Sequence, residues 1–274
     1  MTGGGRVALV VAYDGSRFFG WQRQDRSEHR TVQGDLESAL GRLHGQPVSL
    51  HGASRTDAEV HARAQVAHAE LPGRDRYPPD TLRYRLNGQL GKDLRVRAVI
   101  AVPAGFHARK AALRKDYEYR FHVSPVGDPF VERQVFHVTR PLDLAAMREA
   151  ARSFVGTHDF AAMRSLGSSV ESTVREVLRC ELTGDAPDVR IVVEGTGFLR
   201  HQVRAMAGCL LEVGRGRRPP AWVAEVLEGR DRSRAAANLP GHGLTLVAVC
   251  YPAPLQALLD AALAREHAFP GAQP

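Results

Sequence analysis

The stretch Gly52-Ala53-Ser54-Arg55-Thr56-Asp57-Ala58-Glu59-Val60-His61-Ala62 is a dense run of polar side chains between two apolar segments. The segments on either side, residues 48–52 and 65–71, predict two strands. Ser, Thr and Asp bond their own backbone in such a position, which is typical of a turn. A chemical interpretation is that Asp57 is presented on a loop held between two strands, with Arg55 nearby to hold an anionic ligand. Spacing alone leaves both interpretations open.

The elements around this stretch predict a mixture of helices and strands. Thr31 is a helix cap, and the apolar positions that follow it fall at spacings of 4, 4 and 3. The predicted elements of this part are strands at 7–13, 48–52, 65–71 and 94–102, and helices at 32–43 and around Leu82 and Leu86. The strict strand-helix repeat of a doubly wound sheet is missing, so the pattern favours an α+β fold.

A second half of similar make-up follows. Tyr117, Tyr119 and Phe121 alternate with polar residues, which predicts a strand with one aromatic face. The other predicted elements are helices at 144–154, 199–213 and 222–227 and strands at 174–182, 189–194 and 244–251. We therefore expect one half over residues 1–105 and another over 106–253. Residues 254–274 are rich in Ala and Pro and predict a loosely ordered tail.

The charge of the chain indicates a polyanionic partner. The 274 residues carry 37 Lys and Arg against 30 Asp and Glu, a net charge of +7, and such an excess attracts phosphates. Of these basic residues 34 are Arg and three are Lys, a skew that biased genome composition also produces. On charge alone, nucleic-acid binding stays open.

The composition also excludes several classes. With 43% hydrophobic residues the chain can bury a core. No apolar run reaches the roughly 18 residues of a membrane span, and the apolar run at residues 7–12 is too short for a signal peptide, so we expect a cytoplasmic protein. The three cysteines are far apart in the sequence, which argues against a disulfide framework and a zinc cluster.

The sequence does not contain the common catalytic signatures. Gly91-Lys92 is followed by Asp93 and lacks the first glycine of a P-loop. Residues 52–56 lack the closing glycine of a nucleophile elbow. The twelve histidines show no HExxH spacing, so no metal site is expected.

Eight groups of residues, in order along nearly the whole chain, resemble the tRNA pseudouridine synthases of the TruA family. They are Tyr13-Asp14-Gly15-Ser16 with Phe19-Gly20-Trp21-Gln22-Arg23-Gln24; Thr31-Val32-Gln33; Ser54-Arg55-Thr56-Asp57 with Val60-His61-Ala62; Phe106-His107-Ala108-Arg109; Tyr117 with Tyr119-Arg120; Gly156 with His158-Asp159-Phe160; Phe198-Leu199 with Val203-Arg204; and Leu211-Glu212-Val213-Gly214. The resemblance implies an enzyme that isomerises uridine in the anticodon stem-loop of tRNA, at nucleotides 38 to 40.

The resemblance also implies the architecture and the partners. The fold would be the α+β pseudouridine synthase fold, with two similar α/β halves, mainly antiparallel sheets joined into one central sheet, and a catalytic cleft between the halves. Members use no cofactor and no metal, and they are typically homodimers that bind tRNA.

The resemblance assigns roles to individual residues. Asp57 matches the catalytic aspartate, Arg204 the arginine that pairs with it, and Tyr117 the active-site tyrosine, which could stack on the uracil and serve in proton transfer. Without the resemblance, Arg204 reads as a solvated helix residue and Tyr117 as core. Arg55 matches the residue that holds the flipped nucleotide. His107 and Arg109 are expected at phosphates, and Leu244 and Leu246 either wall the base pocket or pack in the core.

Glu59 departs from the family pattern, in which a glycine is usual. If the position needs a positive φ, the side chain costs about 1 kcal/mol or more; a carboxylate turned toward Asp57 would raise the pKa of Asp57. We expect an ordinary backbone and a side chain that points away, so that Glu59→Gly costs roughly 0.5 to 1 kcal/mol of backbone entropy.

Three other classes compete with the synthase. A non-catalytic tRNA-binding protein or tRNA chaperone would need the basic surface but not Asp57, Tyr117 and Arg204 together. A base deaminase is disfavoured because the sequence lacks its His/Cys metal set. A glycosidase with paired carboxylates has no other support in the sequence.

Overall fold

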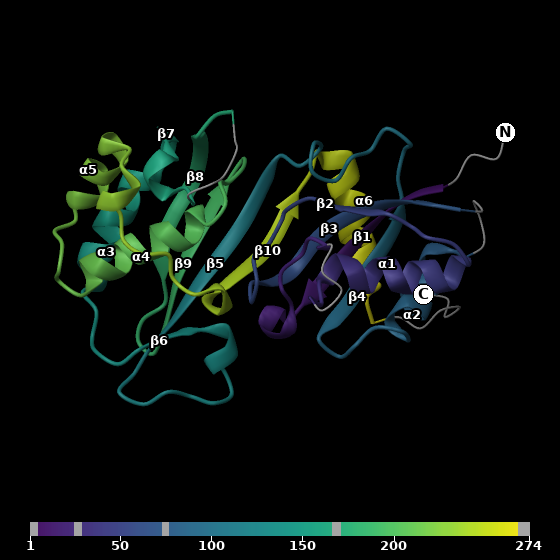
Figure 1. The fold of residues 1–274 in the computed structure, drawn as a ribbon, viewed down its shortest axis with the longest axis horizontal. Coiled ribbons are helices and arrows are strands. Elements are labelled where there is room, and N and C mark those ends of the chain that lie inside the picture. The colour runs from purple at the N-terminus through teal and green to yellow at the C-terminus, as the bar shows by residue number, and fades with distance from the viewer. Residues whose placement is uncertain (1–4, 25–28, 73–76, 166–170, 268–274) are drawn as a thin grey trace. The chain divides into compact units, whose positions relative to one another are not determined.

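The computed structural model describes residues 5–24, 29–72, 77–165 and 171–267. The chain forms two compact units, which Figure 1 shows in colours that follow the sequence. Unit 1 comprises residues 1–113 and 246–274, and unit 2 comprises residues 114–245. The boundary thus lies later than the predicted division at 105/106, and the chain returns to unit 1 after residue 245, which the sequence did not predict.

Unit 1 is built on the buried strand β1, which pairs antiparallel with β3 on one side and β4 on the other. Strands β2 and β10 both pair with β3. Helices α2 and α6 pack against β4, and α1 packs against α2 and β2. The elements are β1 (Gly5–Tyr13), α1 (Val32–His44), β2 (Leu50–Gly52), β3 (His61–Leu71), α2 (Pro79–Asn87), β4 (Leu94–Ala101), β10 (Leu244–Cys250, which begins in unit 2) and α6 (Ala253–Ala264).

Helix α1 forms as its sequence predicts. The Thr31 side chain accepts a hydrogen bond from the backbone N–H of Gly34 at 3.2 Å and so caps the first turn. Val32, Leu36 and Leu40 are fully buried on one face. Gly45 ends the helix with φ 75°, a left-handed conformation that glycine adopts without strain.

Unit 2 contains the antiparallel strands β5, β9, β8 and β7 in that order, with β6 parallel to β5. Helices α3 and α4 pack against each other, and they contact β8 and β5 respectively. The elements are β5 (Arg114–Val123), β6 (Phe136–Val138), α3 (Leu144–Ala151), β7 (Gly156–Asp159), β8 (Val174–Thr183), β9 (Asp188–Gly195), α4 (Gln202–Gly214) and α5 (Trp222–Gly229). The mainly antiparallel α+β class predicted from the sequence is confirmed.

Strand β5 carries the predicted aromatic face. Tyr119 and Phe121 are fully buried, and a Cβ at Gly243 would lie within 2.6 to 2.8 Å of the Tyr119 ring. Glycine is therefore required there by close packing rather than by its backbone conformation.

Two predictions about elements are wrong. The helix predicted from residue 199 begins at Gln202, because His201 before it has φ 65° and cannot belong to a right-handed helix. The predicted loose tail is helix α6 over residues 253–264, which buries Leu259 and Ala262; residues 268–274 lie outside the described part. Strands β6 and β7 were not predicted, because three or four residues carry too little periodicity.

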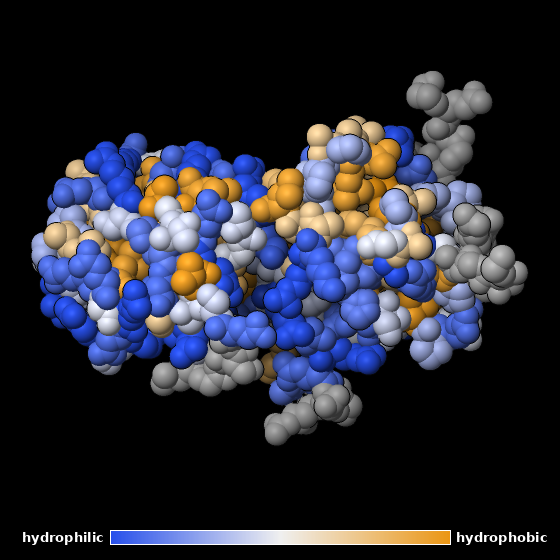
Figure 2. All heavy atoms as spheres, turned by 90° about the horizontal axis from the view of Figure 1, so that it is seen from above, coloured by the Kyte–Doolittle hydropathy of each residue, from blue (hydrophilic) through white to orange (hydrophobic). Residues whose placement is uncertain are grey.

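The face in Figure 2 is mainly hydrophilic, with separate hydrophobic patches. Across the described ranges, none of the helices has the length and apolar character that a membrane crossing requires.

Candidate active site

The loop that carries Asp57 joins β2 to β3 and is fixed at its base. The backbone N–H of Ala53 donates to the carbonyl of Val66 at 2.7 Å. The buried amide of Gln65 accepts from the Ser54 N–H at 3.2 Å and donates to the Ser54 carbonyl at 2.7 Å. These bonds satisfy the backbone where the chain leaves the sheet, so the loop is an ordered structure.

A second segment, residues 13–21, holds the middle of the loop. The Trp21 N–H donates to the Thr56 carbonyl at 3.0 Å, and the Tyr13 hydroxyl is 2.7 Å from the Thr56 hydroxyl. On the other side of Asp57, the Glu59 N–H donates to the Phe18 carbonyl at 3.3 Å. Asp57 is therefore held through residues on both of its sides, while its own side chain is half-buried.

Two glycines of this segment lie directly against the loop backbone. A Cβ at Gly15 would come within 2.2 Å of the Val60 carbonyl oxygen. A Cβ at Gly20, where φ is 93°, would come within 2.7 Å of the Thr56 carbonyl oxygen and 3.0 Å of the Asp57 carbonyl carbon. Only glycine permits this approach, which explains in physical terms why the Tyr13–Gln24 motif accompanies the Asp57 loop.

The backbone conformation of Glu59 differs from the one expected from the sequence. Its φ is 66°, so the ordinary backbone predicted from the sequence is wrong. Its side chain is exposed. Position 59 thus requires the left-handed conformation that glycine would adopt freely, and the glutamate carries the strain.

Tyr117 and Arg204 lie in unit 2, on β5 and α4. The Tyr117 side chain is buried, and its ring packs edge-on against Phe198 with centroids 5.3 Å apart. Arg204 is half-buried, and its Nε donates to the Leu239 carbonyl at 2.7 Å. Within unit 2, Tyr117 is therefore packed against an aromatic ring and Arg204 is hydrogen-bonded to the backbone, whereas Asp57 belongs to unit 1.

The neighbouring Tyr119 is not an acid or base candidate. Burial raises the pKa of Tyr119, and Arg204 opposes this increase only in part. Its hydroxyl donates to the Pro240 carbonyl at 3.0 Å. Tyr119 thus stays neutral and structural, while Tyr117 remains the predicted functional tyrosine of this strand.

Leu244 and Leu246 are two residues apart on β10 and both are buried. Their spacing places them on one face of the strand. Leu246 is completely buried, so its packing in the core is certain and a role in a base pocket remains a prediction.

The predicted RNA-binding residues all belong to unit 1, but to two different segments. Arg55 lies exposed on the Asp57 loop, whereas His107 and Arg109 share the turn after β4, where His107 is half-buried and Arg109 exposed. The sequence analysis missed His51 and His68, whose rings lie 6.1 and 4.6 Å from that of His107. His51 on β2 and His68 on β3 are directly paired across the two strands, a relation that one sequence does not indicate.

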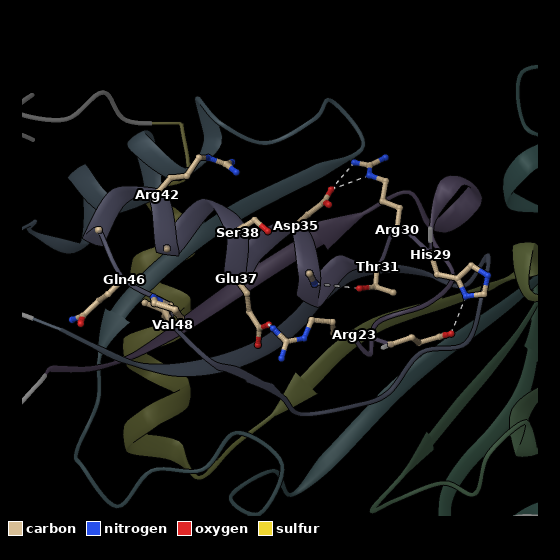
Figure 3. A pocket seen from close by; sticks show the side chains of 15 residues that line it. Arg23, His29, Arg30, Thr31, Asp35, Glu37, Ser38, Arg42, Gln46 and Val48 are labelled. Atoms are coloured by element: carbon tan, nitrogen blue, oxygen red, sulfur yellow. Dashed lines mark hydrogen bonds and ion pairs between the residues drawn. The ribbon is translucent and has the colours of Figure 1, made fainter. Parts of the chain in front are cut away.

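A pocket along the outer face of α1, shown in Figure 3, contains none of the predicted site residues. Two of its three arginines are ion-paired: Arg23 with Glu37 at 2.7 Å and Arg30 with Asp35 at 2.8 Å. Arg30 also reaches Asp93 at 2.6 Å, and both contacts raise its pKa. These pairs hold α1 to the segment before it, so we assign the pocket a structural role.

Among the residues that the structure describes, no group of three His, Cys, Asp or Glu side chains is arranged to hold a metal ion. Cys180 and Cys209 are buried thiols, and burial raises the pKa of both, that of Cys209 to about 11. Neither thiol is therefore an activated nucleophile.

Comparison with known proteins identifies the family. The family model of tRNA pseudouridine synthases matches residues 9–109 and 150–252. A protein named tRNA pseudouridine synthase A from Syntrophotalea carbinolica is 43% identical, over 89% of this chain and 96% of its own length. Proteins of the same name from Brevibacillus brevis and Escherichia fergusonii are 42% and 38% identical, each over 90% of this chain, and over 99% and 90% of their own lengths. The chain therefore belongs to the tRNA pseudouridine synthase family.

Proposed function

We propose that this member of the tRNA pseudouridine synthase family isomerises uridine to pseudouridine at nucleotides 38 to 40 of the anticodon stem-loop, with Asp57 as the catalytic carboxylate. The observation that carries the proposal is the match to relatives named tRNA pseudouridine synthase A along about nine-tenths of the chain. The ordered loop around Asp57 supports it, because catalysis needs a carboxylate in a fixed position.

In the proposed reaction the bond between uracil N1 and ribose C1′ breaks, the base turns, and a bond between C5 and C1′ forms. The proton on C5 is then lost and a proton is gained at N1, so the product is an isomer of the substrate. Asp57 either attacks the sugar as a nucleophile or assists loss of the 2′ proton. Both routes need an ionised carboxylate.

Tyr117 and Arg204 complete the proposed machinery. Arg204 would keep Asp57 ionised, because an adjacent guanidinium lowers the pKa of a carboxyl. Tyr117 would stack on the uracil and take part in the proton transfer from C5. Leu244 and Leu246 would form an apolar wall beside the base.

The uridine must leave its stack before the carboxylate can reach its sugar. We propose that Arg55, exposed beside Asp57, holds the flipped nucleotide, and that His107 and Arg109 contact phosphates. The enzyme would act in the cytoplasm as a homodimer, without a cofactor or metal.

The test is to incubate the purified chain with an unmodified tRNA transcript that was folded with magnesium and then transferred to chelator. We expect pseudouridine at one or more of nucleotides 38 to 40, and none in a transcript with cytidine at those positions. Failure to modify any tRNA, or a need for added metal after folding, would contradict the proposal.

Asp57→Asn separates catalysis from binding. We expect turnover to be abolished and tRNA affinity to stay within about tenfold, roughly 1.4 kcal/mol, because the carboxylate serves chemistry while basic side chains supply binding. Filter binding and single-turnover assays measure the two effects. A variant that retains wild-type activity would exclude Asp57 as the catalytic group.

A further inference from the structure

The turn at residues 106–110, which follows β4 in unit 1, has its backbone pinned from three directions. Arg6 on β1 donates from Nη1 to the Phe106 carbonyl at 2.6 Å. The Ala108 N–H donates to Nδ1 of His68 on β3 at 3.2 Å. The Tyr251 hydroxyl, which follows β10, donates to the Ala108 carbonyl at 2.9 Å. A surface turn with this many partners is built to present side chains in fixed positions.

The side chains of the turn divide into an inner and an outer set. Phe106 and Ala108 are buried, and the Phe106 ring packs against His68 and Tyr251 with centroids 5.9 and 5.7 Å apart. The outer set is His107, half-buried, with Arg109 and Lys110, which are exposed. The pinned backbone thus displays one imidazole and two cations.

The imidazole of His107 is a neutral donor. The Arg109 N–H donates to Nδ1 of His107 at 3.2 Å, so Nδ1 carries no proton and the proton is on Nε2. Burial lowers the pKa of His107, and the nearby Lys110, His51 and Arg6 lower it further. Its Nε2–H is therefore the donor of an imidazole that burial and the neighbouring charges hold in the neutral form.

His68 is also held neutral, for a related reason. It is 4% exposed, and its ring lies 5.2 Å from that of His51 and 4.6 Å from that of His107. Burial, with the charges of these histidines and of Arg6, lowers the pKa of His68 to about 4. Because only neutral Nδ1 accepts the Ala108 N–H, this low pKa keeps the turn pinned at physiological pH.

The charged groups around the turn at residues 106–110 favour the binding of an anion. Lys110 and Arg109 lie on the turn itself, and Arg6 reaches it from β1, where Arg6 also pairs with Glu70 at 2.5 Å. His51 contributes an exposed ring from β2. Arg6 is neutralised by Glu70, so the exposed positive charge comes from Arg109 and Lys110.

We propose that residues 106–110 form a binding site for an RNA phosphodiester, in which neutral His107 donates its Nε2–H and Arg109 and Lys110 supply the charge, and that His68 is the positioning residue that holds this turn. The proposal rests on the proposed function for the identity of the RNA as tRNA. It goes further in defining how His107 binds and which residue outside the turn controls it.

Salt dependence distinguishes the neutral donor from the cations. A cation that contacts a phosphate releases counterions, and its loss lowers the slope of log affinity against log salt by about 0.7 to 0.9; a neutral donor releases none. We expect Arg109→Gln and Lys110→Gln each to reduce this slope. We expect His107→Leu to weaken tRNA binding about fivefold to tenfold with the slope unchanged, and His107→Gln, whose amide can donate from a similar position, to bind within about twofold of wild type.

The pH dependence gives a second readout. Between about pH 7.5 and 8.5 the contribution of His107, measured as the affinity ratio of wild type to His107→Leu, stays constant. A ratio that grows steadily as the pH falls would mean that His107 binds as a cation and would overturn its neutral role.

The positioning role of His68 is tested by a matched pair. His68→Asn places an amide oxygen where it can accept the Ala108 N–H, whereas His68→Leu cannot accept it. We expect His68→Leu to weaken tRNA binding at least fivefold and His68→Asn to restore most of the loss. Equal affinities of both variants and wild type would remove His68 from the site.

Two controls separate this inference from other causes. Lys92→Gln removes an exposed charge elsewhere in unit 1; if it weakened binding as much as Lys110→Gln, general charge rather than the turn would be responsible. Inorganic phosphate at about 10 mM should not compete with tRNA, since one contact among many is weak alone. If wild type makes pseudouridine but the turn variants bind tRNA normally, the inference about the turn fails and the proposed function stands. If no tRNA is modified but the turn variants lose tRNA binding, the proposed function fails and the inference about the turn stands.

Discussion

Glu59, on the loop that carries Asp57, shows how a single residue carries backbone strain. Its φ of 66° costs an ordinary residue about 1 to 2 kcal/mol, whereas glycine at the same position costs about 0.5 to 1 kcal/mol of chain entropy. We therefore expect Glu59→Gly to stabilise the protein by roughly 0.5 to 1 kcal/mol, the opposite sign from the sequence-based expectation. Because the side chain is exposed, the single-turnover rate should not change.

The adjacent Ala58 provides the control. It is exposed and is not among the residues with positive φ, so Ala58→Gly should destabilise by roughly 0.5 to 1 kcal/mol. Urea unfolding of the two variants measures both effects. If both changed stability in the same direction, backbone strain at Glu59 would not explain the result.

The protonation of His68 makes the free energy of unfolding depend on pH. Its folded pKa is about 4 and its ordinary value 6.5, so between these values the unfolded chain binds a proton that the folded chain does not. The stability that depends on neutral His68 is fully present above pH 6.5. As the pH falls toward 4, the free energy of unfolding decreases by up to about 1.4 kcal/mol per pH unit. We expect wild type to lose more stability than His68→Asn between pH 7 and pH 5, measured by urea midpoints. Equal losses would show that His68 is charged or accessible in the folded state.

At the scale of elements, the segment from Tyr13 to Trp21 acts as a support for the Asp57 loop. Gly20→Ala would place a methyl group 2.7 Å from the Thr56 carbonyl oxygen, so the loop must move. Displacements of about 1 Å at a catalytic group cost up to about a hundredfold in rate. We expect Gly20→Ala to lower the single-turnover rate at least tenfold, with tRNA affinity within about threefold.

Gly45 makes a matched control for this change. It also has a positive φ, 75°, but a Cβ there meets nothing within 4 Å. Gly45→Ala should therefore cost about 1 to 2 kcal/mol of stability through the backbone alone and leave the rate unchanged. Equal rate losses in the two variants would show that strain, rather than contact with the loop, is responsible.

The helices differ in how far the sequence predicts them. Long periodic elements such as α1 were predictable, since cap, apolar spacing and terminal glycine agree. The start of α4 was not, because nothing in the sequence indicates that His201 adopts φ 65°. Asp57 was singled out by resemblance, but the contacts between its loop and residues 13–21 join residues about 35 to 43 positions apart, and one sequence does not reveal such pairs.

For the whole molecule, the sequence predicted two halves but not that unit 1 is assembled from both ends of the chain. Helix α6 packs on β4, and Glu266 just after it pairs with Arg97 at 2.7 Å, which lowers the pKa of Glu266. The segment looked like a tail because its Ala and Pro content resembles disordered sequence. Its order comes from tertiary packing, which composition does not record.

The discontinuous assembly of unit 1 predicts that α6 stabilises elements more than 150 residues away in sequence. Leu259 is 3% exposed and Leu258 is 56% exposed, so they form a matched pair on one helix. We expect Leu259→Ala to lower the free energy of unfolding by about 2 to 4 kcal/mol through lost burial and a cavity, and Leu258→Ala by less than about 0.5 kcal/mol. The chain has two tryptophans, and Trp21 is buried in unit 1 while Trp222 belongs to unit 2. In a Trp222→Phe background, the fluorescence of Trp21 then reports the unfolding of unit 1 alone. If Leu259→Ala and Leu258→Ala had the same urea midpoint for this transition, α6 would not be part of the core of unit 1.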